Sequence, residues 1–221
     1  MINQLLLGIL SSIVGSAIIV VITGLISKKA KWILVGILSR IVDSDLDFVF
    51  LNKKGAEEDL KYEINRAKKV LILAGRGNEL NRSTFSKLFS EDPNGLEKDV
   101  RILLPAIKNL GDEKDWTDQR EKEVAIFDIS YQNEGILKKQ IETNIDFVNH
   151  HKNKGILNWG LFNIPHIGRI IITDKVAYYT PYEATAHGRD SKVFKFRKSG
   201  DFYNNFERLF EQLWSNRLKY E

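Results

Sequence analysis

Cysteine is absent from this chain of 221 residues, and histidine occurs only four times. Without cysteine there is no thiolate to hold a metal, and a histidine-based site would need carboxylates from distant parts of the chain. We therefore expect no metal and no cofactor. The lack of cysteine also agrees with a reducing compartment, where disulfides do not persist.

Charge is missing from the start of the chain, because residues 1–27 contain no Asp, Glu, Lys or Arg. Residues 5–26 consist almost wholly of Leu, Ile, Val, Ala, Gly and Ser, and Lys28, Lys29 and Lys31 follow them. At about 1.5 Å per residue this run makes roughly 33 Å of helix, enough for a hydrocarbon core of about 30 Å. The pattern predicts an uncleaved transmembrane anchor at residues 1–27.

Two other interpretations of this segment fit the pattern less well. A cleaved signal peptide carries positive charge before its apolar run, whereas here the lysines follow the run. A buried core helix of a soluble protein rarely runs this long without a charge. The lysines predict a single-pass protein of the cell inner membrane, with its N-terminus outside and its C-terminal domain in the cytoplasm.

Residues 28–44 are too short to cross a bilayer again and predict a juxtamembrane helix. Trp32 stands beside lysines, which is typical of a helix along the headgroups; a helix packed on the following domain is the alternative. Residues 45–221 suffice for one domain with its own core. The net charge of +4 is a mild surplus that suits an anionic membrane face at least as well as nucleic acid.

Hydrophobic patterning divides residues 45–221 into helices and strands. Strands are predicted at 70–74, 100–104, 168–173, 176–180 and 193–196, with a two-residue hairpin turn at Asp174-Lys175. Helices are predicted at 55–67, 83–90, 113–127, 134–148 and 201–218. This order predicts an α/β fold with a mixed sheet flanked by helices.

Two short motifs carry polar groups suited to chemistry. Gly75-Arg76-Gly77 follows a buried strand and precedes a helix, so it is either a phosphate-binding loop or a turn that lines a cleft. It lacks the third glycine of the dinucleotide fingerprint and the lysine of a P-loop. His150-His151-Lys152 offers a nucleophile or a ligand, or else a solvated helix end whose cations favour the helix dipole.

A third motif, His187-Gly188-Arg189-Asp190-Ser191, gathers a base, an acid and a hydroxyl in one loop. A Ser-His-Asp triad does not follow from three neighbours, because separate elements must set its geometry. The loop is either an anion-binding segment, through Arg189 and the backbone of Gly188, or a plain turn.

Several segments between residues 60 and 217 form one further pattern. They are 69–75, 99–104, the hairpin 169–179, Pro181-Tyr182, the loop 187–191, and the ending from Phe206-Glu207 to Trp214. Together they resemble the phospholipase D-like superfamily, most closely its compact single-copy bacterial version. The resemblance implies a phospholipase D-like mixed sheet flanked by helices, behind the anchor.

Active members of that superfamily carry the motif His-x-Lys-(x)4-Asp. Its histidine attacks phosphorus, and its lysine holds phosphate oxygens. With Asp174 placed on the motif's Asp, the lysine position falls on Arg169 and the histidine position on Ile167. His166 is one residue off, so its side chain would point to the opposite face of a strand.

The other His-x-Lys of the chain, at His150 and Lys152, has Leu157 where the motif needs Asp. The resemblance therefore implies a degenerate site without phosphodiesterase chemistry. Arg169 can still bind phosphate there, bidentately and without reacting.

Our first hypothesis is a membrane-anchored, catalytically degenerate module that binds a phosphorylated small molecule or a protein partner and signals to the membrane. A defence or toxin-like effector belongs to this hypothesis. The ligand-binding residues that it names are Arg169, Thr180, Tyr182, His187, Gly188, Arg189, Asp190 and Ser191. One motif half per chain implies a homodimer or higher oligomer, which small residues on one face of the anchor (Gly8, Ser12 and Ser16) would favour.

Two other hypotheses remain open. The chain could be an active phosphodiesterase, transferase or nuclease that uses a displaced histidine: His166, His187 or His150. It could instead be a tethered nucleic-acid binder. The small surplus of charge, and the lack of a basic run with interleaved aromatics, speak against nucleic acid as a partner.

Overall fold

The computed structural model describes most of the chain. The described residues are 2–41, 45–82, 84–85, 88–89, 98–107, 116–133, 135–152, 156–165, 168–183 and 187–218. His166, Ile167 and half of the helix predicted at 83–90 lie outside these residues.

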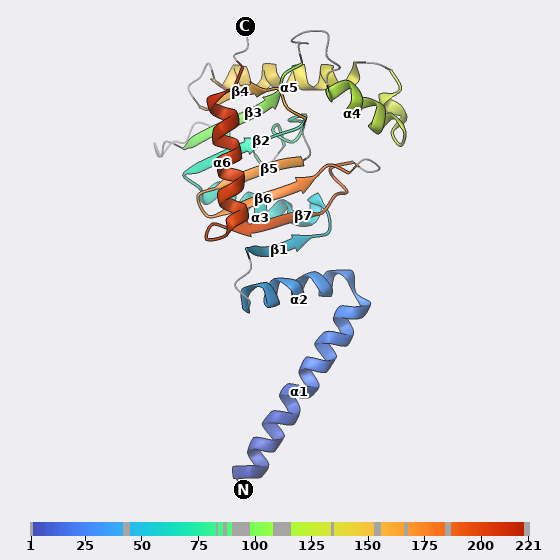
Figure 1. The fold of residues 1–221 in the computed structure, drawn as a ribbon, viewed down its shortest axis with the longest axis vertical. Coiled ribbons are helices and arrows are strands. Elements are labelled where there is room, and N and C mark those ends of the chain that lie inside the picture. Colours follow the sequence, from blue (N-terminus) through green and yellow to red (C-terminus); the bar gives the residue numbers. More distant parts are fainter. Residues whose placement is uncertain are drawn as a thin grey trace.

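A seven-stranded sheet forms the centre of the domain, in the order β1-β7-β6-β5-β2-β3-β4 (Figure 1). Strands β2, β3 and β4 run parallel, and the other neighbours pair antiparallel. The strands are β1 Leu46–Phe50, β2 Lys69–Leu73, β3 Asp99–Pro105, β4 Asn158–Phe162, β5 Gly168–Thr173, β6 Val176–Pro181 and β7 Val193–Arg197. The predicted mixed sheet and its β5–β6 hairpin are confirmed.

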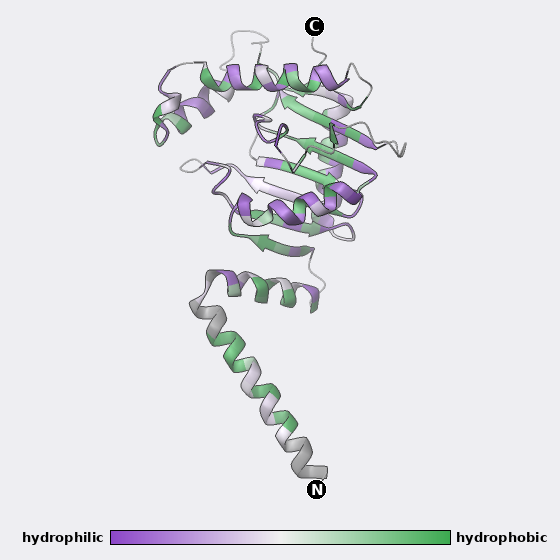
Figure 2. Cartoon of the chain, turned by 180° about the vertical axis from the view of Figure 1, so that it is seen from behind, coloured by the Kyte–Doolittle hydropathy of each residue, from purple (hydrophilic) through white to green (hydrophobic). Residues whose placement is uncertain are grey.

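Helices cover both faces of this sheet, because successive strand residues point to opposite sides. On one face α3 (Lys53–Arg66) and α5 (Ile136–Lys152) pack against Val70 and Ile72 of β2. On the other face α6 (Asp201–Ser215) packs against Leu71 and Leu73. Figure 2 shows the sheet strands as mainly hydrophobic beneath helices of mixed character. The helix α4 (Trp116–Ala125) lies beside α5.

The aromatic side chains of α6 are buried to different extents. Phe210 is 1% exposed, whereas Phe202 is 54% exposed. Phe202 lies at the start of the helix and contacts Phe196 of β7, with ring centroids 5.0 Å apart. Next to β7 lies only β1, which is the edge of the sheet. The side of the Phe202 ring that faces away from Phe196 therefore has little of the sheet to pack against.

Two helices precede the sheet: α1 (Ile2–Ile26) and α2 (Lys28–Ile41). Helix α2 packs on the edge strand β1. A Cβ at Gly36 would lie 3.1 Å from the carbonyl oxygen of Asp47, and Ser39 donates a hydrogen bond to the carbonyl of Leu46. Arg40 forms an ion pair with Asp47 at 2.8 Å. Residues 28–41 therefore form a helix that packs on the edge of the sheet.

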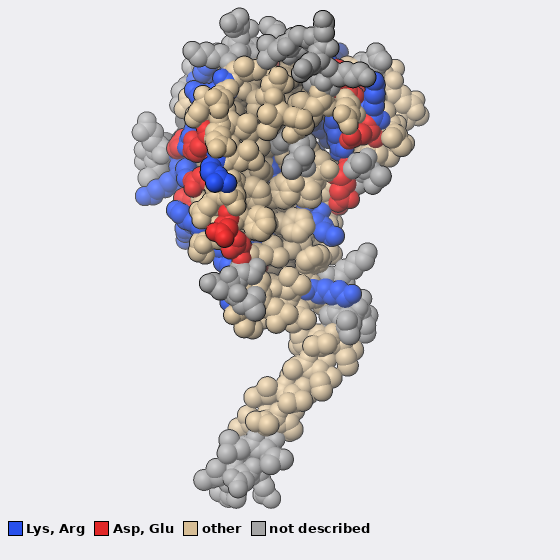
Figure 3. Space-filling view, in the orientation of Figure 1, with Lys and Arg blue, Asp and Glu red and all other residues tan. Residues whose placement is uncertain are grey.

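Helix α1 extends away from the domain (Figure 1) and exposes apolar side chains, among them Ile13 at 62% and Ile18 at 53%. In Figure 3 the coloured part of α1 is tan throughout, so it shows no charged side chain on the visible face. Nevertheless, none of the helices within the described residues combines the length and the apolar character that a membrane crossing needs. The transmembrane helix expected at residues 1–27 therefore gains no support from this part of the chain.

Candidate functional site

A cavity of about 340 Å³ opens at the end of the sheet where β2 finishes and β5 begins. Ligands of open α/β sheets bind at such strand ends, where loops from neighbouring strands converge. Residues from the start of α3, the loop after β2, α4, α5, and the loop after β6 also line it. The cavity is large enough for a small organic molecule.

Cationic side chains dominate the lining of this cavity. Among the described residues that line it, two are acidic: Glu79 and Asp128. The six cations are Lys53, Arg76, Arg82, Arg120, Arg169 and Arg189. A concave site lined by one sign of charge focuses its field, so the cavity attracts anions.

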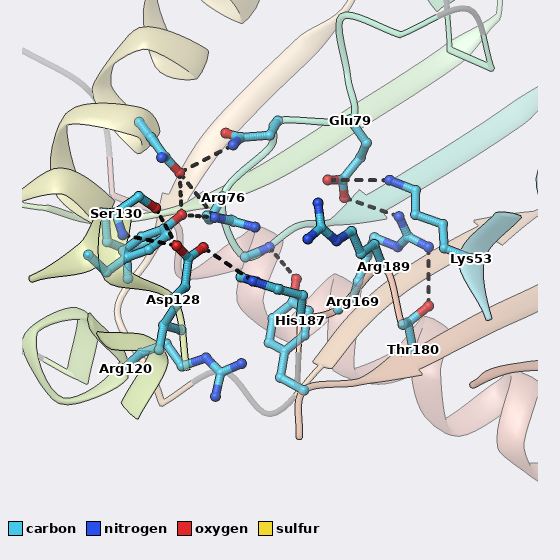
Figure 4. A pocket seen from close by; sticks show the side chains of 18 of the residues that line it. Lys53, Arg76, Glu79, Arg120, Asp128, Ser130, Arg169, Thr180, His187 and Arg189 are labelled. Carbon is cyan, nitrogen blue, oxygen red and sulfur yellow. Dashed lines mark hydrogen bonds and ion pairs between the residues drawn. The ribbon is translucent and has the colours of Figure 1, made fainter. Parts of the chain in front are cut away.

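One buried and two half-buried charges form what we call the guanidinium end of the cavity: Arg169, Lys53 and Glu79. Arg169 is 4% exposed; its guanidinium lies 3.3 Å from the Glu79 carboxylate and donates to the Thr180 hydroxyl at 3.1 Å. The Lys53 ammonium lies 3.9 Å from the same carboxylate. Figure 4 shows Lys53 and Arg169 converging on Glu79.

The pKa values at this end follow from burial and from these neighbours. Burial by itself would raise the pKa of Glu79, but Arg169 and Lys53 outweigh it and hold the pKa at about 2. Burial lowers the pKa of Lys53 to about 8; Glu79 opposes this shift, and Arg169 and Arg82 add to it. The guanidinium end is thus mostly charged at neutral pH, and Lys53 has lost about half of its charge near pH 8.

The loop Gly75-Arg76-Gly77 lines the cavity, and its glycines have separate structural reasons. The backbone N–H of Gly75 donates to the Tyr182 hydroxyl at 3.0 Å, and a Cβ on Gly75 would lie 2.5 Å from that hydroxyl oxygen. Gly77 has φ of +81°, which favours glycine. The motif is therefore a turn that lines the cavity, through Gly75 and Arg76.

His187 lies on the opposite side of the cavity from Lys53 in Figure 4 and faces Asp128. Its Nε2 is 3.2 Å from Asp128 Oδ2. Asp128 also accepts hydrogen bonds from the backbone N–H and the hydroxyl of Ser130, at 3.0 and 2.6 Å. These bonds from Ser130 lower the pKa of Asp128, and the carboxylate fixes the orientation of the imidazole.

Six of the eight predicted ligand-binding residues line this cavity. They are Arg169, Thr180, Tyr182, His187, Gly188 and Arg189. The other two do not: Asp190 is exposed, and Ser191 is fully buried and donates to the carbonyl of His187 at 3.4 Å. Asp190 also donates its backbone N–H to that carbonyl at 2.9 Å, so the end of this loop is a tight turn.

Other lining residues gave no recognisable signal in the sequence. Lys53, Glu79, Arg120 and Asp128 come from separate elements, and none of them belongs to a motif. Asp128, rather than the adjacent Asp190, is the acid that contacts His187. Of the lining residues outside the predicted eight, Arg76 had a signal in the sequence: it stands between two glycines directly after a buried strand.

The other histidine motif lies elsewhere. His150, His151 and Lys152 form the last turn of α5, and none of them lines the cavity. The His151 ring packs against Phe147 and Phe89, with centroids 4.6 and 4.9 Å apart. The described part of the chain contains no group of three or more His, Asp or Glu side chains that could hold a metal ion.

Among the solved structures that resemble this chain are two that can be described. No protein family and no curated protein matches the chain in sequence. TrmBL2, an archaeal chromatin protein whose structure shows a mode of DNA binding, is 13% identical, with a TM-score of 0.44 over 77% of this chain and 52% of that one. The chain thus spans about half the length of TrmBL2.

The second likeness is to Nuc from Salmonella typhimurium, a member of the phospholipase D family. It is 16% identical, with a TM-score of 0.47 over 78% of this chain and 97% of that one. It belongs to the superfamily that the sequence resembles. At such identities and TM-scores the two likenesses carry no argument about the site or the activity of this chain.

We expect sulfate binding by the full chain to weaken above pH 8, by about tenfold at most for the loss of one cation. Lys53 is charged below its pKa of about 8 and neutral above it, whereas arginines keep their charge. Sulfate keeps both its charges in this range, so calorimetric titration from about pH 7 to 9.5 isolates the lysine. The Lys53→Gln variant should bind sulfate more weakly at pH 7 and show a flat profile. A variant that keeps the wild-type slope would contradict the assignment to Lys53.

Proposed function

We propose that this chain is a phospholipase D-like module that binds a phosphorylated small molecule in the cavity without hydrolysing it. One observation carries the proposal: among the residues that the structure describes, six cations and two acids surround one concave site. Phosphate groups suit such a site because guanidinium groups donate paired hydrogen bonds to their oxygens. The sequence adds that an isoleucine, Ile167, stands where the superfamily's motif has its nucleophilic histidine.

The guanidinium end is the best place for the phosphate. Arg169 is held in position by Glu79 and Thr180, so little ordering is needed when an anion arrives. Arg189, whose side chain is 72% exposed, and Arg82 stand at the rim and can close on the bound group.

The Arg169→Gln variant should bind inorganic phosphate about 10- to 100-fold more weakly, because hydrogen bonds to charged groups contribute about 1.5–3 kcal/mol. Arg169→Lys should fall between the variant and the wild type, since it keeps the charge but loses the fork of donors. Isothermal titration calorimetry measures both, with melting temperatures as a check on folding. Arg208→Gln, on the exposed side of α6, is the matched control. Unchanged phosphate affinity in a folded Arg169→Gln chain would refute the proposal.

A second function, phosphodiesterase chemistry at His187, is favoured by the contact with Asp128. If Nε2–H donates to Asp128, the lone pair of Nδ1 is free to attack phosphorus. The N–P bond would form as the ester P–O bond breaks, and the leaving alkoxide would take a proton from solvent water. Water would then hydrolyse the phosphohistidine.

We expect the first function to prevail, so the full chain should release no nitrophenol from bis(4-nitrophenyl) phosphate. His187→Asn should also leave phosphate binding within about threefold of wild type, because a rim imidazole contributes little beside the arginines. Turnover that His187→Asn abolishes, together with a phosphohistidine found by mass spectrometry, would establish the second function instead.

We propose further that α1 attaches the domain to a membrane. The exposed apolar side chains of α1, the uncharged residues 1–27 and the lysines that follow support attachment. Because α2 packs on β1, the domain would be held close to the bilayer surface rather than on a long tether.

The full chain should therefore sediment with vesicles of phosphatidylcholine and phosphatidylglycerol. The double variant Ile13→Glu/Ile18→Glu should remain largely in the supernatant, since two buried carboxylates make insertion of this helix unfavourable by several kcal/mol. Ile126→Glu changes an isolated side chain that is 85% exposed and serves as the control. A wild-type chain that stays in the supernatant would exclude membrane attachment while leaving the phosphate proposal untouched.

A further inference from the structure

The cavity has a second end, which differs in chemistry from the guanidinium end. We call it the amide end, and it is formed by Asn78, Tyr131 and Gln140, with Arg76 beside them. In Figure 4 Arg76 and Ser130 lie well apart from Lys53 and Glu79. Among the described residues, Arg76 has no carboxylate partner at this end, and the groups there are joined by hydrogen bonds.

A chain of hydrogen bonds fixes the orientation of these amides from the interior outward. Asn144 is 4% exposed, and its amide donates to the backbone carbonyl of Arg76 at 2.9 Å and to Asn78 Oδ1 at 2.6 Å. Asn78 can therefore only donate from its nitrogen, and it does so to Gln140 Oε1 at 3.2 Å. Each amide in this series determines the orientation of the next.

Gln140 Oε1 is saturated by this arrangement. It accepts from Asn78, from Arg76 at 3.1 Å and from the Tyr131 hydroxyl at 2.9 Å. The other end of the amide, Nε2, forms no hydrogen bond within the part of the chain that the structure describes, and Gln140 is only partly buried. Gln140 thus offers two N–H donors of fixed orientation at the cavity wall.

Flat surfaces accompany these donors. The Arg76 guanidinium lies over the Tyr131 ring at 5.7 Å, and that of Arg120 lies over the Tyr182 ring at 5.8 Å. All four residues line the cavity. A guanidinium that lies on an aromatic ring presents its other face to a ligand, and guanidinium planes and aromatic rings both stack on flat heterocycles.

From these observations we infer that the ligand carries a planar ring with a hydrogen-bond acceptor at the end opposite its phosphate, as a nucleoside monophosphate does. The inference rests on the proposed binding of phosphate at the guanidinium end. Gln140 then donates to a ring carbonyl or ring nitrogen, while Arg169 and Lys53 hold the phosphate. A sugar phosphate without a ring system fills only the guanidinium end.

The test compares three probes on the full chain by calorimetry: inorganic phosphate, ribose 5-phosphate and uridine monophosphate. Uridine monophosphate should bind at least about tenfold more tightly than ribose 5-phosphate, the value of one well-placed hydrogen bond and a stacking contact. Gln140→Glu keeps an acceptor for Arg76, Asn78 and Tyr131 but replaces the Nε2 donors with an oxygen. Gln140→Met removes the donors without adding charge.

Both variants should reduce the ratio of uridine monophosphate affinity to phosphate affinity by about tenfold. The ratio matters because the added charge of Gln140→Glu weakens every anionic probe alike. If ribose 5-phosphate binds as tightly as the nucleotide, or if the ratio is unchanged in a variant with a wild-type melting temperature, the inference is wrong. If inorganic phosphate itself fails to bind, the proposed function fails, which is a different result.

Discussion

The ion cluster of Lys53, Glu79 and Arg169 is the interaction on which the site depends. The Glu79 carboxylate has a pKa of about 2 despite its burial, because the two cations stabilise its charge. The cluster joins the start of α3, the loop after β2 and the start of β5 at one end of the sheet. Since Glu79 already holds both cations in place, an entering anion meets donors whose positions are fixed.

Helix α3 connects this cluster to the N-terminal helices. Lys53 opens the helix at the cavity, and Asp59 and Glu63 further along it bind Lys195 of β7 at 2.9 and 3.2 Å. Burial would lower the pKa of Lys195, but these acids outweigh it and raise the value. Lys195 also lies 3.9 Å from Asp47 of β1, the strand on which α2 packs. Through Lys195, α3 is linked to the strand that supports α2.

Much of the fold could be predicted from the sequence, because local patterns report burial directly. The strand predicted at 70–74 and the helix predicted at 55–67 are confirmed, and Leu60 and Ile64 of that helix are buried. The strands β1 and β4 were missed for physical reasons. Strand β1 is an edge strand whose residues are mostly half-buried, and β4 contains Gly160 within a short mixed run, so neither shows a clear period of two.

By itself the sequence determined the layered α/β fold, the uncharged N-terminal helix and the cationic candidates Arg169 and Arg189, since these depend on residue type and on spacing along the chain. Only the tertiary structure decided that Glu79 lies between Arg169 and Lys53, and that Asp128 contacts His187. The partners in these pairs are separated by 26 to 90 positions in the sequence. No local pattern encodes such contacts, because the crossing of strands and the packing of helices bring the side chains together.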